Sequence, residues 1–242
     1  MIFETMLAID GRIVQLEEHF ERLRTSALAL GLPPPDESAF RSGAAGSHPV
    51  GPVRRAKSPS FQIALRCVYD GAFSFSSGQI PARTLRRRKG ARVVTLDRSI
   101  VREQPEHKLT SYAEWLRDQT IEADEALFID RRGRVLEGLT TNVFATDGST
   151  LITARDRVLP GIVRSWVLAN ARRAGLRVIE RRPTIDELRG GSFLTSSLTL
   201  LAPIVTINTL ACTRPGPAFA TLRRLYRAEI ARASRAVSRG TP

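Results

Sequence analysis

The pattern of apolar and polar positions predicts strands at the start of the chain. Residues 2–9 form an almost continuous apolar run, and the Asp10-Gly11 dipeptide that follows is a strong hairpin turn signal. A helix is predicted over 17–30, because apolar residues recur there at every third or fourth position. The other strands predicted in this part of the chain are 12–16, 61–69, 72–76 and 92–96.

One segment between these strands has a different composition. Residues 41–60 are rich in Gly, Ser, Pro and Ala and have no apolar period. This composition is typical of loops and linkers. We therefore expect 41–60 to be a mobile loop.

Helices and strands are mixed in the rest of the chain. Apolar spacing predicts helices over 109–123 and 162–174, and Thr184 to Glu187 have the spacing of a capping box that opens a short helix. A C-terminal helix carries an apolar stripe, which runs through Phe219, Leu222, Tyr226, Ile230, Ala233 and Val237. The predicted strands are 125–130, 135–136, 141–146, 150–153, 176–181, 192–195 and 204–207.

No internal repeat is present, and the order of elements predicts a mixed α/β (α+β) protein. The pattern changes near 97–108. We therefore expect a small N-terminal domain over 1–100 and a larger domain over 108–242.

Composition narrows the class of protein. The 242 residues carry a formal net charge of +13, which raises nucleic acid as a partner. However, the basic residues are almost all Arg, they are spread along the chain, and the 6% aromatic residues do not alternate with the basic runs. We interpret the charge as a coding bias and do not expect a nucleic-acid partner.

Membrane, secretory and metal-binding signals are not found in the sequence. No apolar stretch of about 18 residues predicts a membrane span, and the N-terminus does not resemble a secretory signal. Cys67 and Cys212 are expected to be free thiols of a cytoplasmic protein, and no zinc-ligand spacing occurs. We therefore expect no metal.

Lysine is rare, and one lysine stands out. Lys57 lies in the Gly/Ser/Pro-rich segment, and Lys89 follows three arginines, where we expect it to be solvated. Lys108 lies at a junction between a long loop and a predicted helix. An enzyme that uses a lysine amine as a nucleophile needs an amine that can lose its proton, and burial favours this. A single lysine at a junction is, on general grounds, more often structural.

Five short motifs change this interpretation. They are Phe3-Glu4-Thr5 with Asp10-Gly11-Arg12, Leu16, His19, Arg22-Leu23 and Ser26-Ala27; His107-Lys108-Leu109-Thr110; Glu137-Gly138 with Asn142-Val143-Phe144; Leu159-Pro160-Gly161-Ile162; and Phe193-Leu194-Thr195-Ser196-Ser197. In this order and spacing they resemble the class IV aminotransferases, the fold-type IV enzymes that use pyridoxal 5′-phosphate (PLP), over nearly the whole chain. The resemblance implies a small N-terminal α/β domain, a larger C-terminal α/β pseudo-barrel domain, PLP in the cleft between them, and a homodimer.

The resemblance also implies how PLP is held at its reactive end. Lys108 would hold the cofactor covalently and then act as the general acid and base. Glu137 would pair with the pyridine nitrogen and keep it protonated, so that the ring can accept electrons. Asn142 would order Glu137 or the cofactor ring.

The phosphate of PLP is a dianion, and the resemblance implies three kinds of partner for it. Arg22 matches the family's phosphate arginine. The backbone amides of Gly161 and Ile162 lie at a predicted helix start, where an anion is favoured. Ser197, with Ser196, matches the position that supplies a hydroxyl.

The substrate contacts are implied less directly. Arg66 falls near the position where family members place a basic contact to a substrate carboxylate, and Tyr112 lies one helical turn after the lysine. Val163 stands where many relatives have Thr, so one phosphate hydroxyl is expected to be missing.

Two reactions fit these motifs. The first is that of 4-amino-4-deoxychorismate lyase, which releases pyruvate and the folate precursor 4-aminobenzoate. The second is transamination of a D- or branched-chain amino acid. The short chain, the His107-Lys108 pair and the early start of the first motif favour the lyase. A third hypothesis is a non-catalytic binding module on the same fold, and the presence of both Lys108 and Glu137 argues against it.

Overall fold

A computed structural model describes residues 1–47, 61–97 and 103–233 of the chain. They form two compact units. The first takes its described residues from Met1–Ile80, His107–Ala113 and Tyr226–Pro242, and the second from Pro81–Glu106 and Glu114–Leu225. The short segment around Lys108 therefore folds with the N-terminal strands.

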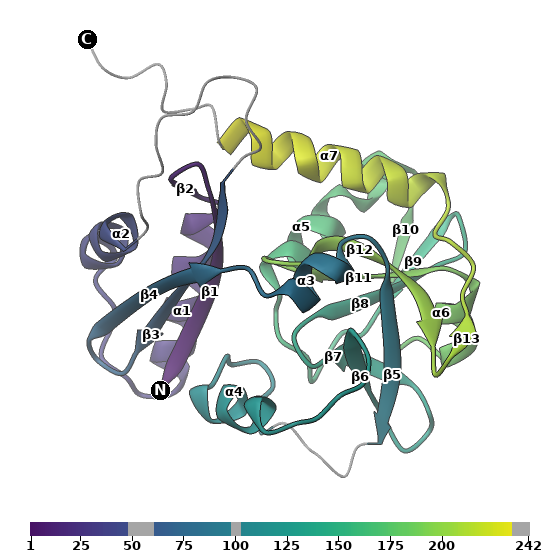
Figure 1. Cartoon of the computed structure of the whole chain (residues 1–242), viewed down its shortest axis with the longest axis horizontal. Coiled ribbons are helices and arrows are strands. Elements are labelled where there is room, and N and C mark those ends of the chain that lie inside the picture. The colour runs from purple at the N-terminus through teal and green to yellow at the C-terminus, as the bar shows by residue number, and fades with distance from the viewer. Residues whose placement is uncertain (48–60, 98–102, 234–242) are drawn as a thin grey trace. The chain divides into compact units, whose positions relative to one another are not determined.

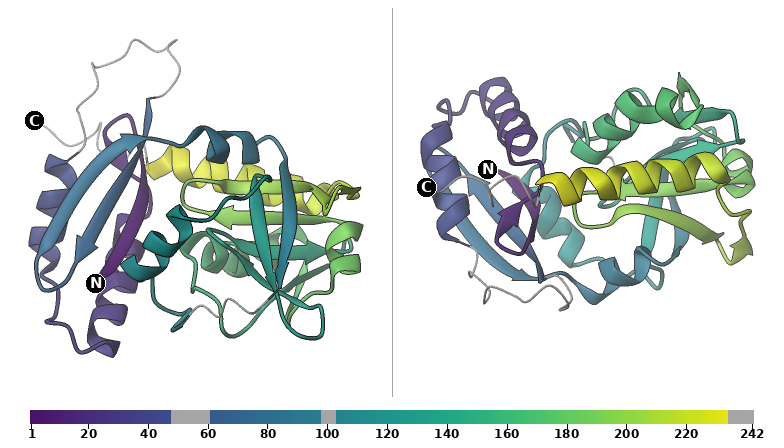
Figure 2. Two further views of the ribbon diagram at one scale, coloured as in Figure 1. Left: turned by 60° about the horizontal axis from the view of Figure 1, so that its bottom comes forward. Right: turned by 90° about the horizontal axis from the view of Figure 1, so that it is seen from above.

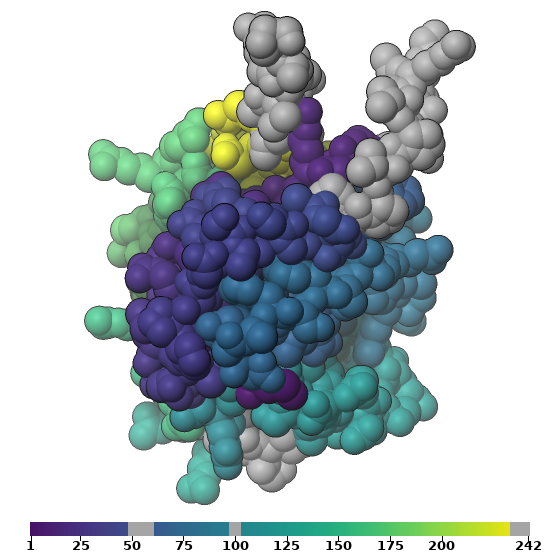
Figure 3. All heavy atoms as spheres, turned by 90° about the vertical axis from the view of Figure 1, so that its left-hand side faces the viewer, coloured from purple at the N-terminus to yellow at the C-terminus, as the bar shows by residue number. Residues whose placement is uncertain are grey.

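The first unit is an antiparallel sheet packed against two helices (Figure 1). Its strands run in the order β2-β1-β3-β4, and helices α1 and α2 pack on β1 and β4. Figure 3 shows α1 and α2 in purple beside the β3–β4 hairpin in blue. The elements are β1 (Ile2–Ile9), β2 (Arg12–Ile13), α1 (Leu16–Ala29), α2 (Glu37–Gly46), β3 (Gln62–Tyr69) and β4 (Phe73–Gln79).

Strand alternation decides what each face of this sheet carries. In the register of β1 and β3, Glu4 lies opposite Cys67, and Met6 lies opposite Leu65. Met6, Leu65 and Cys67 belong to the core that contains the buried apolar residues of α1. Because successive side chains point to opposite faces, Phe3 is on the other face of β1.

The prediction of a loop over 41–60 is wrong for its first residues. Residues 41–46 are the last part of α2, whose N-cap Asp36 accepts a hydrogen bond from the Ala39 amide at 2.6 Å. Phe40 and Ala44 are buried against the sheet, so tertiary packing stabilises a helix in a Gly- and Ala-rich sequence. Residues 48–60 lie outside the described residues.

The second unit contains a nine-stranded mixed sheet that curls into a half-barrel (Figure 2). Its main path is β10-β9-β8-β11-β12-β5-β6-β7, and β13 pairs with β12. The strands are β5 (Ala91–Asp97), β6 (Glu125–Ile129), β7 (Val135–Gly138), β8 (Asn142–Thr146), β9 (Thr150–Thr153), β10 (Arg177–Glu180), β11 (Ser192–Ser196), β12 (Leu200–Ile207) and β13 (Leu210–Ala211). The helices are α3 (Ala82–Arg87), α4 (Thr110–Arg117, which begins in the first unit), α5 (Ile162–Asn170), α6 (Ile185–Gly190) and α7 (Pro217–Ala233, which ends in the first unit).

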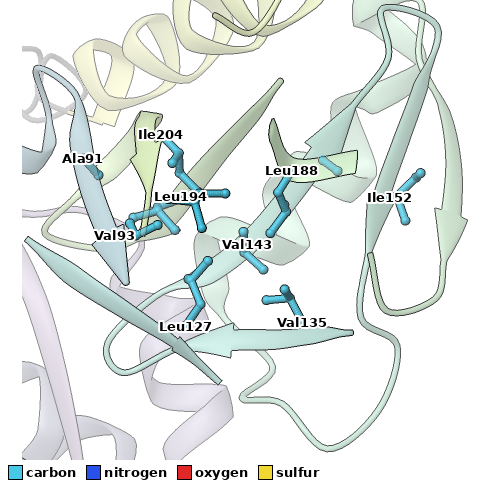
Figure 4. Packing of buried hydrophobic residues seen from close by; sticks show 11 residues of the cluster. Ala91, Val93, Leu127, Val135, Val143, Ile152, Leu188, Leu194 and Ile204 are labelled. Atoms are coloured by element: carbon cyan, nitrogen blue, oxygen red, sulfur yellow. The ribbon is translucent and has the colours of Figure 1, made fainter. Parts of the chain in front are cut away.

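The core of the second unit is aliphatic. Leu127, Val135, Val143, Leu188 and Leu194 come from five different elements and are all buried in one cluster (Figure 4). This packing holds the ends of β7, β8 and β11 in fixed positions. These ends carry two of the five motifs.

Several predicted elements have different lengths in the structure. The helix predicted over 109–123 is α4, which ends at Arg117, because the next amides donate to carbonyls three residues back rather than four. The helix predicted over 162–174 is α5, followed by a short 3₁₀ helix from Ala171 to Ala174. Helix α3 was not predicted. The capping box is confirmed: Thr184 Oγ1 accepts the Glu187 amide at 3.2 Å, and Glu187 Oε2 accepts the Thr184 amide at 2.8 Å.

Three further facts hold for the described residues. No helix among them is long and apolar enough to cross a membrane. Cys67 and Cys212 are both free thiols. No group of three or more His, Cys, Asp or Glu side chains in this part of the chain could hold a metal ion.

Candidate active site

Arg22 is bound to a carboxylate inside the first unit. Its Nε donates to Glu4 Oε1 at 2.8 Å, and its Nη2 donates to Glu4 Oε2 at 2.5 Å. His19 Nδ1 contacts the same Oε2 at 2.7 Å. The Glu4 side chain is 2% exposed and that of Arg22 is 10% exposed. A fixed, bidentate pair of this kind orients the rest of the guanidinium.

The charges in this cluster follow from its contacts. Burial raises the pKa of Glu4, but the charge of Arg22 and the hydrogen bonds from His19 and Arg22 outweigh burial and hold that pKa well below its usual range. Burial lowers the pKa of His19, and the nearby charges of Arg22 and Lys108 lower it further against the opposing effect of Glu4. Glu4 is therefore ionised and His19 is neutral near pH 7.

Lys108 is fixed beside the start of β1 by its own backbone. The Phe3 amide donates to the Lys108 carbonyl at 2.9 Å, and Leu109 forms a bridge with Ile2. The Lys108 side chain is half-buried, and its Nζ lies 4.8 Å from the centroid of the Phe3 ring. The predicted lysine is thus next to the Phe3-Glu4-Thr5 motif, although more than a hundred residues separate them in sequence.

Arg66 lies on the same aromatic ring as Lys108. Its Cζ is 4.2 Å from the Phe3 centroid, a cation–π distance. Arg66 and Lys108 therefore share Phe3 as an aromatic neighbour. Tyr112 is on α4, half-buried and one turn beyond Lys108.

The predicted Glu137 and Asn142 meet in the second unit. Glu137 is 3% exposed and Asn142 is 5% exposed. Asn142 Nδ2 donates to Glu137 Oε2 at 3.2 Å and to the Leu159 carbonyl at 2.9 Å. The Leu159 amide donates to Glu137 Oε2 at 2.9 Å. Two of the five motifs are therefore joined around one buried carboxylate.

Gly161 and Ile162 lie where α5 begins. The Gly161 amide donates to the Leu159 carbonyl at 2.8 Å, so it has a partner within the chain, and Ile162 is the first residue of the helix. No side chain caps this helix start. A Cβ at Gly161 would overlap Asn142 Oδ1, so only glycine allows this close approach.

Ser196 and Ser197 lie in the tight turn from β11 to β12. Ser196 Oγ accepts the Thr199 amide at 3.0 Å, and Leu200 closes the turn with a φ of +63°. Both serines are half-buried. On either side of them, the Oγ1 atoms of Thr195 and Thr199 are buried and have no hydrogen-bond partner within the described residues.

The contacts of two kinds of residue were not predicted from the sequence. Glu4 was quoted as part of a motif but not as the partner of Arg22, although an acid in an otherwise apolar strand is a signal for a buried charge pair. Arg87 and Arg88 belong to the three arginines that precede Lys89, and no sequence signal distinguishes them from their exposed neighbours.

The residues present fit PLP. They include an amine for the aldehyde, a buried carboxylate for the pyridine nitrogen, and a guanidinium with two serine hydroxyls for the phosphate. Gly161 has no side chain, so a ligand can approach its backbone closely. The hydroxyls of Thr195 and Thr199 have no hydrogen-bond partner among the described residues and are further polar groups near the serines. These individual assignments remain predictions.

Comparison with known proteins is consistent with this chemistry. The family model "Amino-transferase class IV" matches residues 1–45 and 70–207. A bifunctional aminodeoxychorismate lyase / D-amino acid transaminase of Mycobacterium tuberculosis is 30% identical over 239 residues, covering 86% of this chain and 81% of the relative. A probable branched-chain-amino-acid aminotransferase of Rickettsia felis is 29% identical, covering 86% of this chain and 77% of the relative.

A solved structure is also similar. The PLP-bound form of a hypothetical aminotransferase from Mycobacterium tuberculosis superposes with a TM-score of 0.72 at 28% identity, covering 92% of this chain and 87% of that one. The fold and the residues described above define a fold-type IV, PLP-dependent enzyme. The chain belongs to the class IV aminotransferase family. The predictions of family, fold class, cofactor and enzymatic nature are confirmed.

Proposed function

We propose that the chain is a 4-amino-4-deoxychorismate lyase that acts in the cytoplasm as a homodimer. The observation that carries the proposal is the shared ring of Phe3. The Lys108 amine and the Arg66 guanidinium both contact this ring, and we assign them to the amine and the carboxylate of one substrate. The preference for a lyase rests on the His107-Lys108 pair and on similarity to a bifunctional relative whose name includes this lyase activity.

Each residue has a distinct task in this proposal. PLP, when bound, supplies an electron-accepting ring for the negative charge that develops at the substrate. Glu137, ordered by Asn142, would hold the proton on the pyridine nitrogen. Arg22, oriented by Glu4, would bind the phosphate. Lys108 would hold the cofactor, and its freed amine would then carry the proton between substrate atoms.

The lyase reaction balances without a co-reactant. The substrate ring loses a proton from carbon, the bond between ring carbon and enolpyruvyl oxygen breaks, and a proton reaches the enolpyruvyl methylene. The products are 4-aminobenzoate and pyruvate. We assign the acceptance of the ring proton to Lys108.

Transamination of a D- or branched-chain amino acid is the second candidate. It is favoured by the same position of Arg66, because an α-amino acid presents its carboxylate next to its amine. This reaction needs a 2-oxo acid as amino acceptor. The two candidates therefore differ in a property that can be measured directly.

The test is product release from enzymatically prepared 4-amino-4-deoxychorismate with no 2-oxo acid added. We expect the PLP-loaded protein to release pyruvate and 4-aminobenzoate in equal amounts, and Lys108→Ala to release neither. Lys89→Ala is the matched control, because Lys89 is exposed, and it should retain the wild-type rate. Conversion of amino acids with 2-oxoglutarate, without pyruvate release from the first substrate, would favour the transaminase.

A further inference from the structure

Two neighbouring arginines at the end of α3 differ from the rest of their basic run. The Arg87 side chain is 6% exposed, and Arg88 is half-buried. By contrast, the Arg86 and Arg92 side chains are 61% and 65% exposed, and Lys89 is exposed. Burying a guanidinium is costly unless it is fully hydrogen-bonded. The contacts of Arg87 and Arg88 therefore indicate what they stabilise.

Arg87 binds the loop that joins Glu137 to Asn142. Its Nη1 donates to Thr140 Oγ1 at 2.6 Å and pairs with Glu125 Oε2 at 3.1 Å. Glu125 Oε2 accepts hydrogen bonds from Thr140 Oγ1 at 2.7 Å and from Thr141 Oγ1 at 3.2 Å. The Glu125 side chain is 1% exposed. A buried ion pair thus holds both threonines of the loop.

The shape of this loop brings Glu137 and Asn142 together. The Gly138 amide donates to the Thr141 carbonyl at 2.7 Å, and a Cβ at Gly138 would overlap Thr141 Oγ1. The absence of a side chain at Gly138 thus leaves room for the Thr141 hydroxyl, which donates to Glu125. If Glu125 moves, Thr141 moves with it, and we expect the distance between Glu137 and Asn142 to change.

Arg88 binds the turn that contains the two serines. Its Nε donates to the Leu198 carbonyl at 2.8 Å. Leu198 lies between Ser197 and Thr199, whose amide is held by Ser196 Oγ. Arg87 thus holds the loop between Glu137 and Asn142, and the next residue, Arg88, holds the turn that contains the two serines.

We propose that Arg87 and Arg88 are positioning residues for PLP. Arg87 fixes the carboxylate that faces the pyridine nitrogen, and Arg88 fixes the turn that faces the phosphate. The inference depends on the proposed roles of Glu137 and Ser197. It predicts two separable effects, one at each end of the cofactor, from adjacent residues of one helix end.

The effect of Arg88 is tested by comparing PLP with pyridoxal, which lacks the phosphate. Both are titrated into the apoprotein, and binding is followed by the visible absorption of the cofactor. We expect Arg88→Gln to weaken PLP binding about tenfold, the effect of one misplaced hydrogen-bonding group, and to change pyridoxal binding less than about twofold. Arg88→Lys should recover part of the PLP affinity. Arg86→Gln removes the same charge from the same helix and should change neither.

The effect of Arg87 is tested through the pH dependence of the bound cofactor's visible band. Arg87→Gln alone leaves Glu125 buried and unpaired and can fail to fold. The informative variant is therefore the double variant Arg87→Gln/Glu125→Gln, which removes both charges of this buried pair. We expect it to shift the midpoint of the band's pH titration in the same direction as Glu137→Gln. Its preference for PLP over pyridoxal should equal that of the wild type.

Two variants separate this inference from the site assignments. If Ser197→Ala leaves the preference for PLP over pyridoxal unchanged, or Glu137→Gln leaves the pH titration unchanged, the assigned roles fail and the positioning roles fail with them. If Ser197→Ala and Glu137→Gln have their effects but the arginine variants do not, only the positioning roles are refuted. Equal weakening of PLP and pyridoxal by Arg88→Gln would indicate a purely structural residue.

Discussion

Substitution of Glu4 by Gln is the sharpest test of the charge cluster in the first unit. Gln has the same shape but leaves the Arg22 charge without a counterion, and it cannot accept all three hydrogen bonds that the carboxylate receives from Arg22 and His19. Removing one partner of a buried ion pair typically costs about 3–5 kcal/mol. The amide keeps one acceptor oxygen, and the Arg22 side chain is 10% exposed. We therefore expect Glu4→Gln to lower the free energy of unfolding by about 3 kcal/mol.

The assay is urea unfolding of the PLP-free protein at pH 7, followed by circular dichroism. Glu21→Gln is the matched control, because it breaks the Arg24–Glu21 pair, whose side chains are 47% and 57% exposed. Exposed pairs contribute less than about 1 kcal/mol. A loss of free energy for Glu4→Gln no larger than that of the control would refute the reasoning.

The same variant has a predictable pH dependence. The pKa of Glu4 is lower in the folded protein than its ordinary value of 4.5, so the carboxylate stabilises the fold above that value. This contribution is lost as the pH falls from 4.5 towards the folded value, because the wild-type carboxyl then becomes neutral, like the amide. The difference in stability between wild type and Glu4→Gln should therefore shrink on acidification. A difference that grows below pH 4.5 would contradict the assigned charges.

Three further predictions follow from other contacts. Gly161→Ala should weaken PLP binding and cost about 1–3 kcal/mol of stability, because the new methyl group overlaps Asn142; unchanged cofactor titration and unfolding curves would contradict this. Iodoacetamide at pH 8 should label Cys212 but not Cys67 in the native protein, as read by peptide mass spectrometry, since burial raises the pKa of Cys67 to about 12 and Cys67 is fully buried; rapid labelling of Cys67 would be the opposing result. Phe40→Ala should cost about 3–5 kcal/mol in urea unfolding, because this buried ring packs against three other aromatic rings; a loss below about 1 kcal/mol would show that the core closes around the cavity.

Local patterns in the sequence were sufficient for many elements. The apolar run of β1, the helical spacing of α1 and the capping box at Thr184 each depend on residues within a few positions of one another. Helix α2 escaped prediction because the Gly and Ser residues in its sequence lower its intrinsic helix propensity. It is stabilised by Phe40 and Ala44, which are buried by strands some thirty residues further along the chain.

The candidate site also has features that local sequence predicts and features that it does not. The chemical types of Lys108, Glu137 and Arg22 could be predicted, because each occurs in a short motif. Their partners could not: Glu4 is 18 residues from Arg22, Thr140 is 53 residues from Arg87, and Leu198 is 110 residues from Arg88. A run of arginines gives no local sign of which members are buried.

The sequence by itself determined the class of chemistry, because motif residues and their order specify an amine, a carboxylate and phosphate-binding groups. Only the tertiary structure decided how these groups are held. Backbone pairing beside β1 places Lys108 on the Phe3 ring, and the curled sheet of the second unit brings the Glu137 loop and the serine turn to one helix end. The physical reason is that hydrogen bonds and ion pairs act over a few ångströms, and folding brings distant residues within that range.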